Sequence, residues 1–145
     1  MANRDQPVNG KHSKLSLRKD GNLVLTDASQ YNIWSTQIKS NSSLQLQLHN
    51  IGNLILHERG NYPIWRSFDH PADTLLPNQP LTRNTKLVSS RSSTNYSSGF
   101  YKLFFDIDNV LRLHYHSPEM TTVYWPDPGF LPWEVPVFVY EKSGS

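Results

Sequence analysis

Side chains that could do chemistry fall into a few short groups, of which the first is a pair of carboxylates. Asp69 and Asp73 lie close together in a proline-rich stretch. A glycan hydrolase needs two carboxylates whose pKa values are driven apart. In a proline-rich segment such residues more often cap turns by accepting backbone N–H bonds, so the structural role is favoured. No nucleophile is predicted, because the chain has no cysteine and no serine in a nucleophile-elbow context.

Two further groups have the residue types of metal ligands. His114 and His116 alternate along one predicted strand, which would place both imidazoles on one face. No third ligand stands at a supporting spacing. The stretch from Asp106 to Asn109 begins like a calcium loop, but the glycine and the terminal glutamate of such a loop do not follow. We therefore predict no metal and no cofactor, and we interpret Asp106 to Asn109 as a turn.

The last group is a polar row on a short strand. Asp20-Gly21-Asn22 has good turn chemistry, and glycine accepts the positive φ that such a turn needs. The strand that follows has a period of two, so Asn22, Val24 and Thr26 should share one side and the leucines between them the other. We expect the leucines in the core and the polar row at the surface.

The elements that position these groups form an internal repeat. Leu15 to Asp27 aligns with Leu46 to Glu58 without a gap, and the match continues to Trp34 and Trp65. Each copy has alternating leucines, a glycine-bearing turn and a second apolar strand, which is typical of a β-hairpin. One supersecondary unit has therefore been used twice. The two tryptophans are expected to be core anchors that close each unit.

The rest of the chain extends this pattern. Prolines after Trp65 predict an irregular wrap, and the serine-rich stretch 89–98 reads as an exposed loop. Residues 99–115 predict a third, degenerate hairpin with its turn at 106–109. No helical period is present, so the fold class is all-β. We divide the chain into residues 1–77, a β-rich continuation 78–125 and a proline-rich irregular tail 126–145.

Composition excludes several functions. The formal net charge is +2 with charges of both signs mixed, which disfavours a nucleic-acid partner. No apolar run is long enough to span a bilayer and none at the N-terminus has the character of a secretory signal, so no membrane insertion is predicted. Two N-glycosylation sequons, at Asn41 and Asn95, lie in polar stretches and favour secretion.

The first hairpin resembles the sugar motif of the bulb-type, mannose-binding lectins, Q-x-D-x-N-x-V-x-Y. Asp20, Asn22 and Val24 match it, whereas Arg18 and Thr26 replace the glutamine and the tyrosine. In the second hairpin only the asparagine and a conservative isoleucine survive, so that site is expected to be lost. The resemblance implies a β-prism of three four-stranded sheets.

Two longer strings indicate the subfamily. Residues 2–7 (ANRDQP) and 65–77 (WRSFDHPADTLLP) are similar to signatures of plant S-domain receptor Ser/Thr kinases. The resemblance covers residues 1–125 and implies an extracellular or plasma-membrane ectodomain module. The family has strands before the A-N-R element, so an incomplete prism with exposed leucines and unpaired strand edges is expected. Kinase strings such as H-R-D and D-F-G are absent from these residues, so no enzyme activity is predicted.

The resemblance implies that a mannose-type glycan would be bound through Asp20, Asn22, Val24 and Thr26. Asp20 would accept bonds from hydroxyls, Asn22 would donate and accept, and Val24 would pack on the sugar ring. The alternative is that Asp20-Gly21-Asn22 is only turn chemistry. The module would then bind a protein partner or support receptor pairing on the same scaffold.

Overall fold

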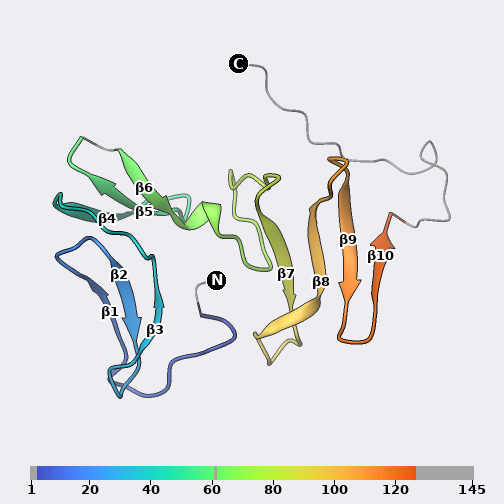
Figure 1. Cartoon of the computed structure of the whole chain (residues 1–145), viewed down its shortest axis with the longest axis horizontal. Helices are drawn as coiled ribbons and strands as arrows, with labels where there is room; N and C mark the ends of the chain where they lie inside the picture. The colour runs from blue at the N-terminus through green and yellow to red at the C-terminus, as the bar shows by residue number, and fades with distance from the viewer. Residues whose placement is uncertain (1–2, 61, 127–145) are drawn as a thin grey trace. The chain divides into compact units, whose positions relative to one another are not determined.

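The computed structural model describes residues 3–60 and 62–126 and is built from β-strands (Figure 1). Ten strands and one short 3-10 helix, η1 (Ser67–Asp69), are found in this part of the chain. The strands form three antiparallel sheets, so the all-β prediction is confirmed. The chain divides into two compact units between His70 and Pro71. The predicted tail lies outside the described residues from 127 onward.

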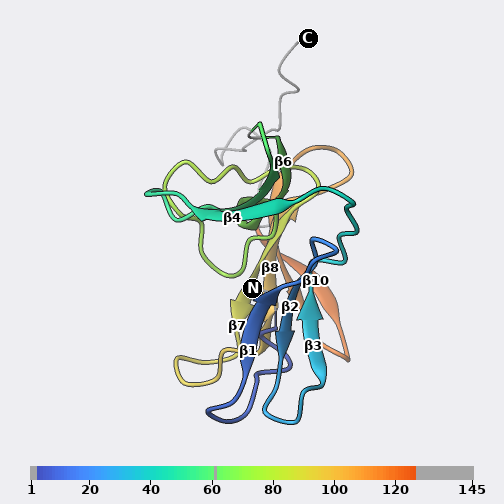
Figure 2. The same cartoon turned by 90° about the vertical axis from the view of Figure 1, so that its left-hand side faces the viewer.

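The first unit contains two three-stranded sheets with the same strand order, and Figure 2 shows the strands of the first sheet side by side. One has the order β1-β2-β3 and the other β4-β5-β6. Leu15 pairs with Leu25 in the first sheet, and Leu46 pairs with Leu56 in the second. Both sheets also carry a bulge at the equivalent position of the central strand. The sequence repeat is therefore confirmed in the pairing register; the strands are β1 (Lys14–Leu17), β2 (Leu23–Thr26), β3 (Asn32–Ser35), β4 (Leu44–Leu48), β5 (Leu54–Glu58) and β6 (Pro63–Arg66).

Burial in this unit is concentrated on the central strands. Leu23, Val24 and Leu56 are almost completely covered, with exposures of 2, 1 and 0 %. The expectation of a buried leucine on the strand after the turn is confirmed for Leu23. The leucines of the outer strands are not covered, since Leu15 is 54 % and Leu48 68 % exposed. The reason is topological, since β1 and β4 are the edges of three-stranded sheets and have no outer strand in the described residues. Exposed leucines on unpaired strand edges, which the resemblance led us to expect, are thus present in the described residues.

The repeated tryptophans pack on each other rather than deep in a core. The Trp34 and Trp65 rings meet edge to face with their centroids 6.0 Å apart, and Trp65 stacks on His70 at 5.5 Å. Both tryptophans are only half-buried, so the expectation that they are core anchors is corrected. Edge-to-face packing of this kind still adds stability beyond the area it buries.

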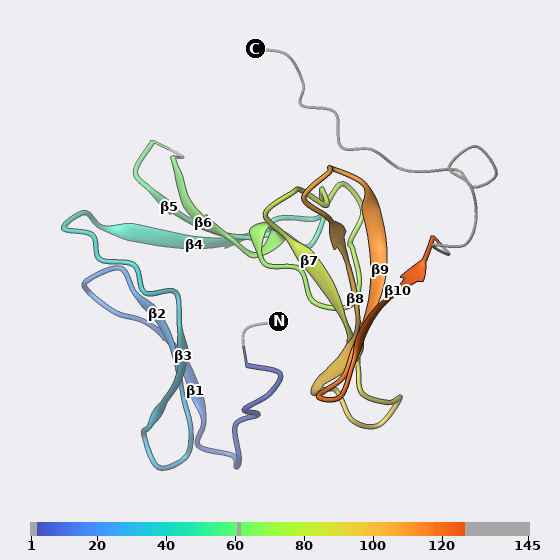
Figure 3. The same cartoon turned by 45° about the vertical axis from the view of Figure 1, so that its right-hand side comes forward.

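The second unit contains the third sheet, with the order β10-β9-β8-β7 (Figure 3). Its hairpin is β8 (Ser98–Phe105) and β9 (Leu111–His116), as predicted, and β10 (Thr121–Trp125) supplies the closing aromatics. The edge strand β7 (Lys86–Ser90) was not predicted, because it is short and its last two serines read as the start of a loop. The stretch 70–85 has neither helix nor strand, so the irregular wrap is confirmed.

The two hairpin glycines allow a matched test of packing at the turn. Gly21 and Gly52 have φ values of 79° and 86°, which an L-residue adopts only with strain. Gly21 is also buried, and a Cβ there would lie 2.5 Å from Leu44 Cδ1. We expect G21A to lower the free energy of unfolding by roughly 1 kcal/mol more than G52A, because only Gly21 adds overpacking to backbone strain. Equal losses of unfolding free energy for G21A and G52A, measured by urea denaturation, would contradict the close packing of Gly21 against Leu44.

Candidate functional site

The turn of the first hairpin already uses hydrogen-bonding atoms of Asp20 and Asn22, two of the predicted sugar-binding residues. Asp20 Oδ1 accepts a hydrogen bond from the Asn22 backbone N–H at 3.1 Å, which is the arrangement of an Asx turn. The Arg18 N–H donates to the Asn22 carbonyl oxygen and the Gly21 N–H to the Arg18 carbonyl oxygen. Asp20 is otherwise exposed, and within the described residues its second carboxylate oxygen has no recorded hydrogen bond.

Asn22 also has a structural bond that recurs in the second repeat. Asn22 Oδ1 accepts from the Thr36 hydroxyl at 2.9 Å, and Thr36 Oγ1 accepts from the Leu23 N–H at 3.0 Å. The equivalent Asn53 Oδ1 accepts from Ser67 Oγ at 3.3 Å, and Ser67 Oγ accepts from the Leu54 N–H. The asparagine oxygen therefore ties the central strand to the residue after the third strand in both copies. In the Asn22 side chain Oδ1 is thus occupied, whereas Nδ2 makes no hydrogen bond within the described residues.

The remaining motif positions lie on the same face of the first sheet. Thr26 pairs with Asn32, and the Arg18 guanidinium donates to Asn32 Oδ1 at 3.1 Å. Val24 lies on this face by register but is 1 % exposed, so its side chain belongs to the core rather than to an open surface. The structure thus brings Thr26 and Arg18 to Asn32. Asn22 instead bonds to Thr36, and Val24 is buried.

Sequence reasoning missed three of these partners. Thr36 and Ser67 are both hydroxyl residues, and they fall on each other when the repeat is extended past the tryptophans, which was the available signal. Asn32 stands opposite Thr26 only because of the bulge between β2 and β3, and no sequence pattern indicates that bulge.

Both sequon asparagines are exposed. Asn41 lies in the loop before β4. Asn95 lies in the loop between β7 and β8, where its Oδ1 accepts from the Ser97 N–H at 3.1 Å and from the Ser97 hydroxyl at 2.7 Å.

The third hairpin has the same turn as the first, with different chemistry. The Asp106 N–H donates to the Val110 carbonyl oxygen and the Asn109 N–H to the Asp106 carbonyl oxygen, as Arg18 and Gly21 do in the first hairpin. Asp108 Oδ1 accepts from the Val110 N–H at 3.1 Å and is the counterpart of Asp20. The interpretation of residues 106–109 as a turn is confirmed.

An ion-pair cluster follows this turn. Arg112 binds Asp108 in a bidentate manner, at 2.6 and 2.7 Å, and approaches Asp106 Oδ2 at 3.3 Å. His114 Nε2 lies 3.5 Å from the same Asp106 oxygen but makes no hydrogen bond, while His116 Nδ1 pairs with the Thr121 hydroxyl at 2.7 Å. The two histidines therefore have separate partners, and no group of three metal-ligating residues occurs among residues 3–60 and 62–126.

Asp108 gives a pH-dependent signature of this cluster. The hydrogen bonds from Arg112 lower the pKa of Asp108 from 3.8 to about 2. Because the folded pKa is below the unfolded value, the pair stabilises the fold above pH 3.8, and this contribution is lost as the pH falls towards 2. We expect the Asp108 carboxyl carbon to titrate near 2 by NMR and R112Q to return the midpoint towards 3.8. A native midpoint near 3.8 would contradict the bidentate pair.

The carboxylate pair considered for hydrolysis does not form a catalytic arrangement in the described geometry. Asp69 lies in η1 with its Oδ2 3.9 Å from Arg66 Nε, and Asp73 Oδ1 accepts from Thr74 Oγ1 at 3.2 Å. Both contacts are to residues close by in the chain, so a structural role remains the interpretation. No helix within the described residues is long and apolar enough to cross a membrane.

Comparison with known proteins places most of this sequence in one family. The D-mannose binding lectin family matches residues 1–97. The receptor protein kinase ZmPK1 of Zea mays is 48 % identical over 128 residues, which are 88 % of this chain and 15 % of that protein. EP1-like glycoprotein 2 of Arabidopsis thaliana is 47 % identical over 133 residues, covering 89 % of this chain and 29 % of its own length.

A third relative is the G-type lectin S-receptor-like serine/threonine-protein kinase B120 of Arabidopsis thaliana. It is 38 % identical over 117 residues, which are 73 % of this chain and 14 % of that protein. The chain thus spans less than a third of each of these three relatives, and its 145 residues contain no kinase sequence. The match over residues 1–97, with relatives of this identity over most of the chain, shows that the chain belongs to the D-mannose binding (bulb-type) lectin family.

Proposed function

We propose that the chain is a carbohydrate-recognition module that binds a mannose-type glycan on the first hairpin through Asp20, Asn22 and Thr26. The observation that carries the proposal is that the second carboxylate oxygen of Asp20 and the Asn22 amide Nδ2 make no hydrogen bond within residues 3–60 and 62–126. A carboxylate that accepts and an amide that donates can together hold two neighbouring sugar hydroxyls. The family match supports a carbohydrate as the ligand.

The site is a reduced one. Val24 supports the strand from the core, so it supplies shape behind the site rather than a contact with the ring. Arg18, which stands where the motif has glutamine, donates to Asn32 and keeps the edge of the site polar. With few polar groups and no apolar platform, a single mannose should bind weakly, with a Kd of about 1 mM or about −4 kcal/mol.

The test is calorimetric titration of the folded chain with methyl α-mannoside and with an oligomannose glycan. We expect saturable binding, tighter for the oligosaccharide, and a clearly weaker response to methyl α-galactoside, whose hydroxyls differ in orientation. Equal affinity for both monosaccharides, or no binding by a chain shown to be folded, would overturn the proposal.

We further propose that the module works outside the cell, in a receptor or a secreted glycoprotein. The named relatives and the exposure of Asn41 and Asn95 support this location. When the protein is produced through a secretory pathway, mass spectrometry should detect N-glycans at both asparagines. Unmodified asparagines would count against the extracellular location.

A protein-interaction role on the same scaffold is the second candidate. The observation that favours it is the exposure of Leu15, Leu17, Leu46 and Leu48 on the edge strands β1 and β4. Exposed apolar edges of this kind pair readily with another chain. In that case D20N/N22D would bind the protein partner as tightly as the unchanged chain does.

A further inference from the structure

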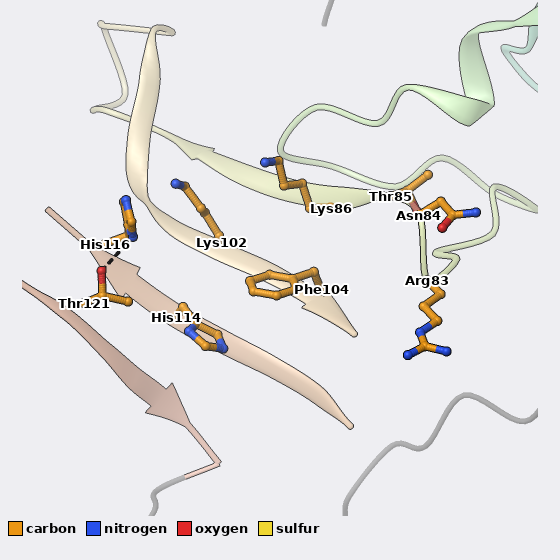
Figure 4. A pocket seen from close by; sticks show the side chains of 9 residues that line it. All are labelled: Arg83, Asn84, Thr85, Lys86, Lys102, Phe104, His114, His116 and Thr121. Atoms are coloured by element: carbon orange, nitrogen blue, oxygen red, sulfur yellow. Dashed lines mark hydrogen bonds between the residues drawn. The ribbon is translucent and has the colours of Figure 1, made fainter. Parts of the chain in front are cut away.

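A basic pocket lies on the third sheet, on the face that corresponds to the motif face of the first hairpin. Its volume is about 440 Å³, within the range of about 300–1,000 Å³ that small-molecule sites occupy. The pocket is built from β7, β8, β9 and the start of β10, together with the stretch before β7 (Figure 4). We propose that it binds an acidic saccharide, one whose sugar rings carry carboxylates.

The strand register explains how the pocket forms. Lys86 pairs with Phe104, Phe104 with Arg112, and Lys102 with His114. Paired residues in antiparallel strands share one face, so these side chains gather on one side of the sheet. The opposite face carries the apolar partners Leu87, Leu103 and Leu113. The sheet thus has one apolar face and one cationic face.

The charge on this face is positive and largely uncompensated. Three cations line the pocket, namely Arg83, Lys86 and Lys102, and none of its nine lining residues is a carboxylate. The nearby Asp106 and Asp108 are engaged by Arg112 at 2.6 to 3.3 Å. Arg83 donates to the neutral carbonyl oxygen of Ile107 at 3.0 Å. An anionic group entering the pocket would therefore meet ammonium groups that form no ion pair with a carboxylate of residues 3–60 and 62–126.

The other lining groups indicate that the anion belongs to a larger, hydroxylated ligand. Phe104, the cross-strand partner of Lys86, offers an apolar ring whose one face is stacked on His114 at 4.8 Å. Asn84 adds a neutral amide that can pair with hydroxyls, whereas the Thr85 and Thr121 hydroxyls already bond to Thr82 and His116. The volume exceeds what a lone inorganic anion fills. A sugar ring with a carboxylate supplies all three features at once, since its C–H face packs on the aromatic ring and its hydroxyls reach the polar rim.

The third hairpin has the same turn as the first but different residues after it. Asp108 and the turn at 106–109 match Asp20 and its turn, but the residues that follow are Arg112 and His114 instead of Val24 and Thr26. The neutral side chains of Val24 and Thr26 are therefore replaced by ionisable ones on the third hairpin. The two sites are expected to bind different sugars and to be separable by mutation.

The test is titration of the full chain with trigalacturonate at low ionic strength, compared with its methyl ester. We expect saturable binding of the acid alone, an affinity that falls with added salt, and a loss of about tenfold or more in K86Q/K102Q. The matched control K14Q/K39Q removes the same charge from the first unit and should leave the affinity unchanged. Circular dichroism should show both double variants folded, and the single change K86Q, at an exposed residue, serves if the double variant is not.

Other outcomes would overturn the proposal. Equal binding of the ester, equal binding by K86Q/K102Q, or no binding by the folded chain would each remove the acidic-saccharide site. Sulfate, phosphate or acetate binding as tightly as trigalacturonate would show a simple anion site and reject the saccharide. D20N/N22D should leave trigalacturonate binding unchanged, so failure here and failure of the mannose site are distinguishable.

Discussion

Replacing Leu56 by alanine is expected to lower the free energy of unfolding by about 2–5 kcal/mol. Leu56 lies at the centre of β5 with an exposed fraction of 0 %, paired with Leu46 on one side and Trp65 on the other. Its truncation removes buried apolar surface and leaves a cavity between two fixed neighbours. A marginally stable module can lose most of its folded population through such a change.

Leu48 provides the matched control. It is the same residue type on the neighbouring strand of the same sheet, but its exposed fraction is 68 %. L48A should change the unfolding free energy by no more than about 0.5 kcal/mol in urea denaturation. Similar losses for L56A and L48A would mean that β4 is covered in solution and that the core is larger than the described contacts indicate.

Binding of methyl α-mannoside is expected to fall by about 100-fold or more in D20N/N22D. D20N keeps the acceptor Oδ1 that holds the Asn22 N–H but replaces the charged acceptor available to a sugar hydroxyl. N22D keeps the acceptor for the Thr36 hydroxyl and removes the amide donor. Each lost bond to a charged or polar partner is worth roughly 1.5 kcal/mol, so both together exceed a factor of 100.

These isosteric changes separate binding from folding. Alanine at position 22 would also break the bond to Thr36, so a loss of affinity could reflect a displaced strand. D27N is the control, because Asp27 caps the neighbouring turn through the Tyr31 N–H at 2.8 Å and carries the same charge. Retained affinity in D20N/N22D would assign both residues to turn chemistry alone.

The parts of the fold that follow from local pattern could be predicted. Alternating leucines and a turn glycine set the hairpins, and the repeat set the pairing of β1 to β2 and of β4 to β5. Burial could not be predicted in the same way, because whether Leu15 is covered depends on whether another strand lies beside β1. Strand β7 was missed since its pairing with β8 is non-local and its own sequence is short and polar.

The candidate site, like the fold, could be predicted only where local sequence pattern decides it. The motif residues could be read from the sequence, but the use of the Asn22 oxygen depends on Thr36, which β3 brings to the start of β2. Likewise the lysines of the third sheet are far apart in sequence, and only the register of β7 with β8 brings Lys86 beside Phe104. Local propensity gives the strands, whereas function arises from contacts between them.

Mapping of backbone amide shifts during titration with an oligomannose glycan tests the central claim most directly. We predict saturable chemical-shift changes confined to the first hairpin and β3, at Asp20, Asn22, Thr26 and Asn32, with no change on the third sheet. Saturable changes elsewhere, with the first hairpin unaffected, would contradict a mannose-type site on this hairpin.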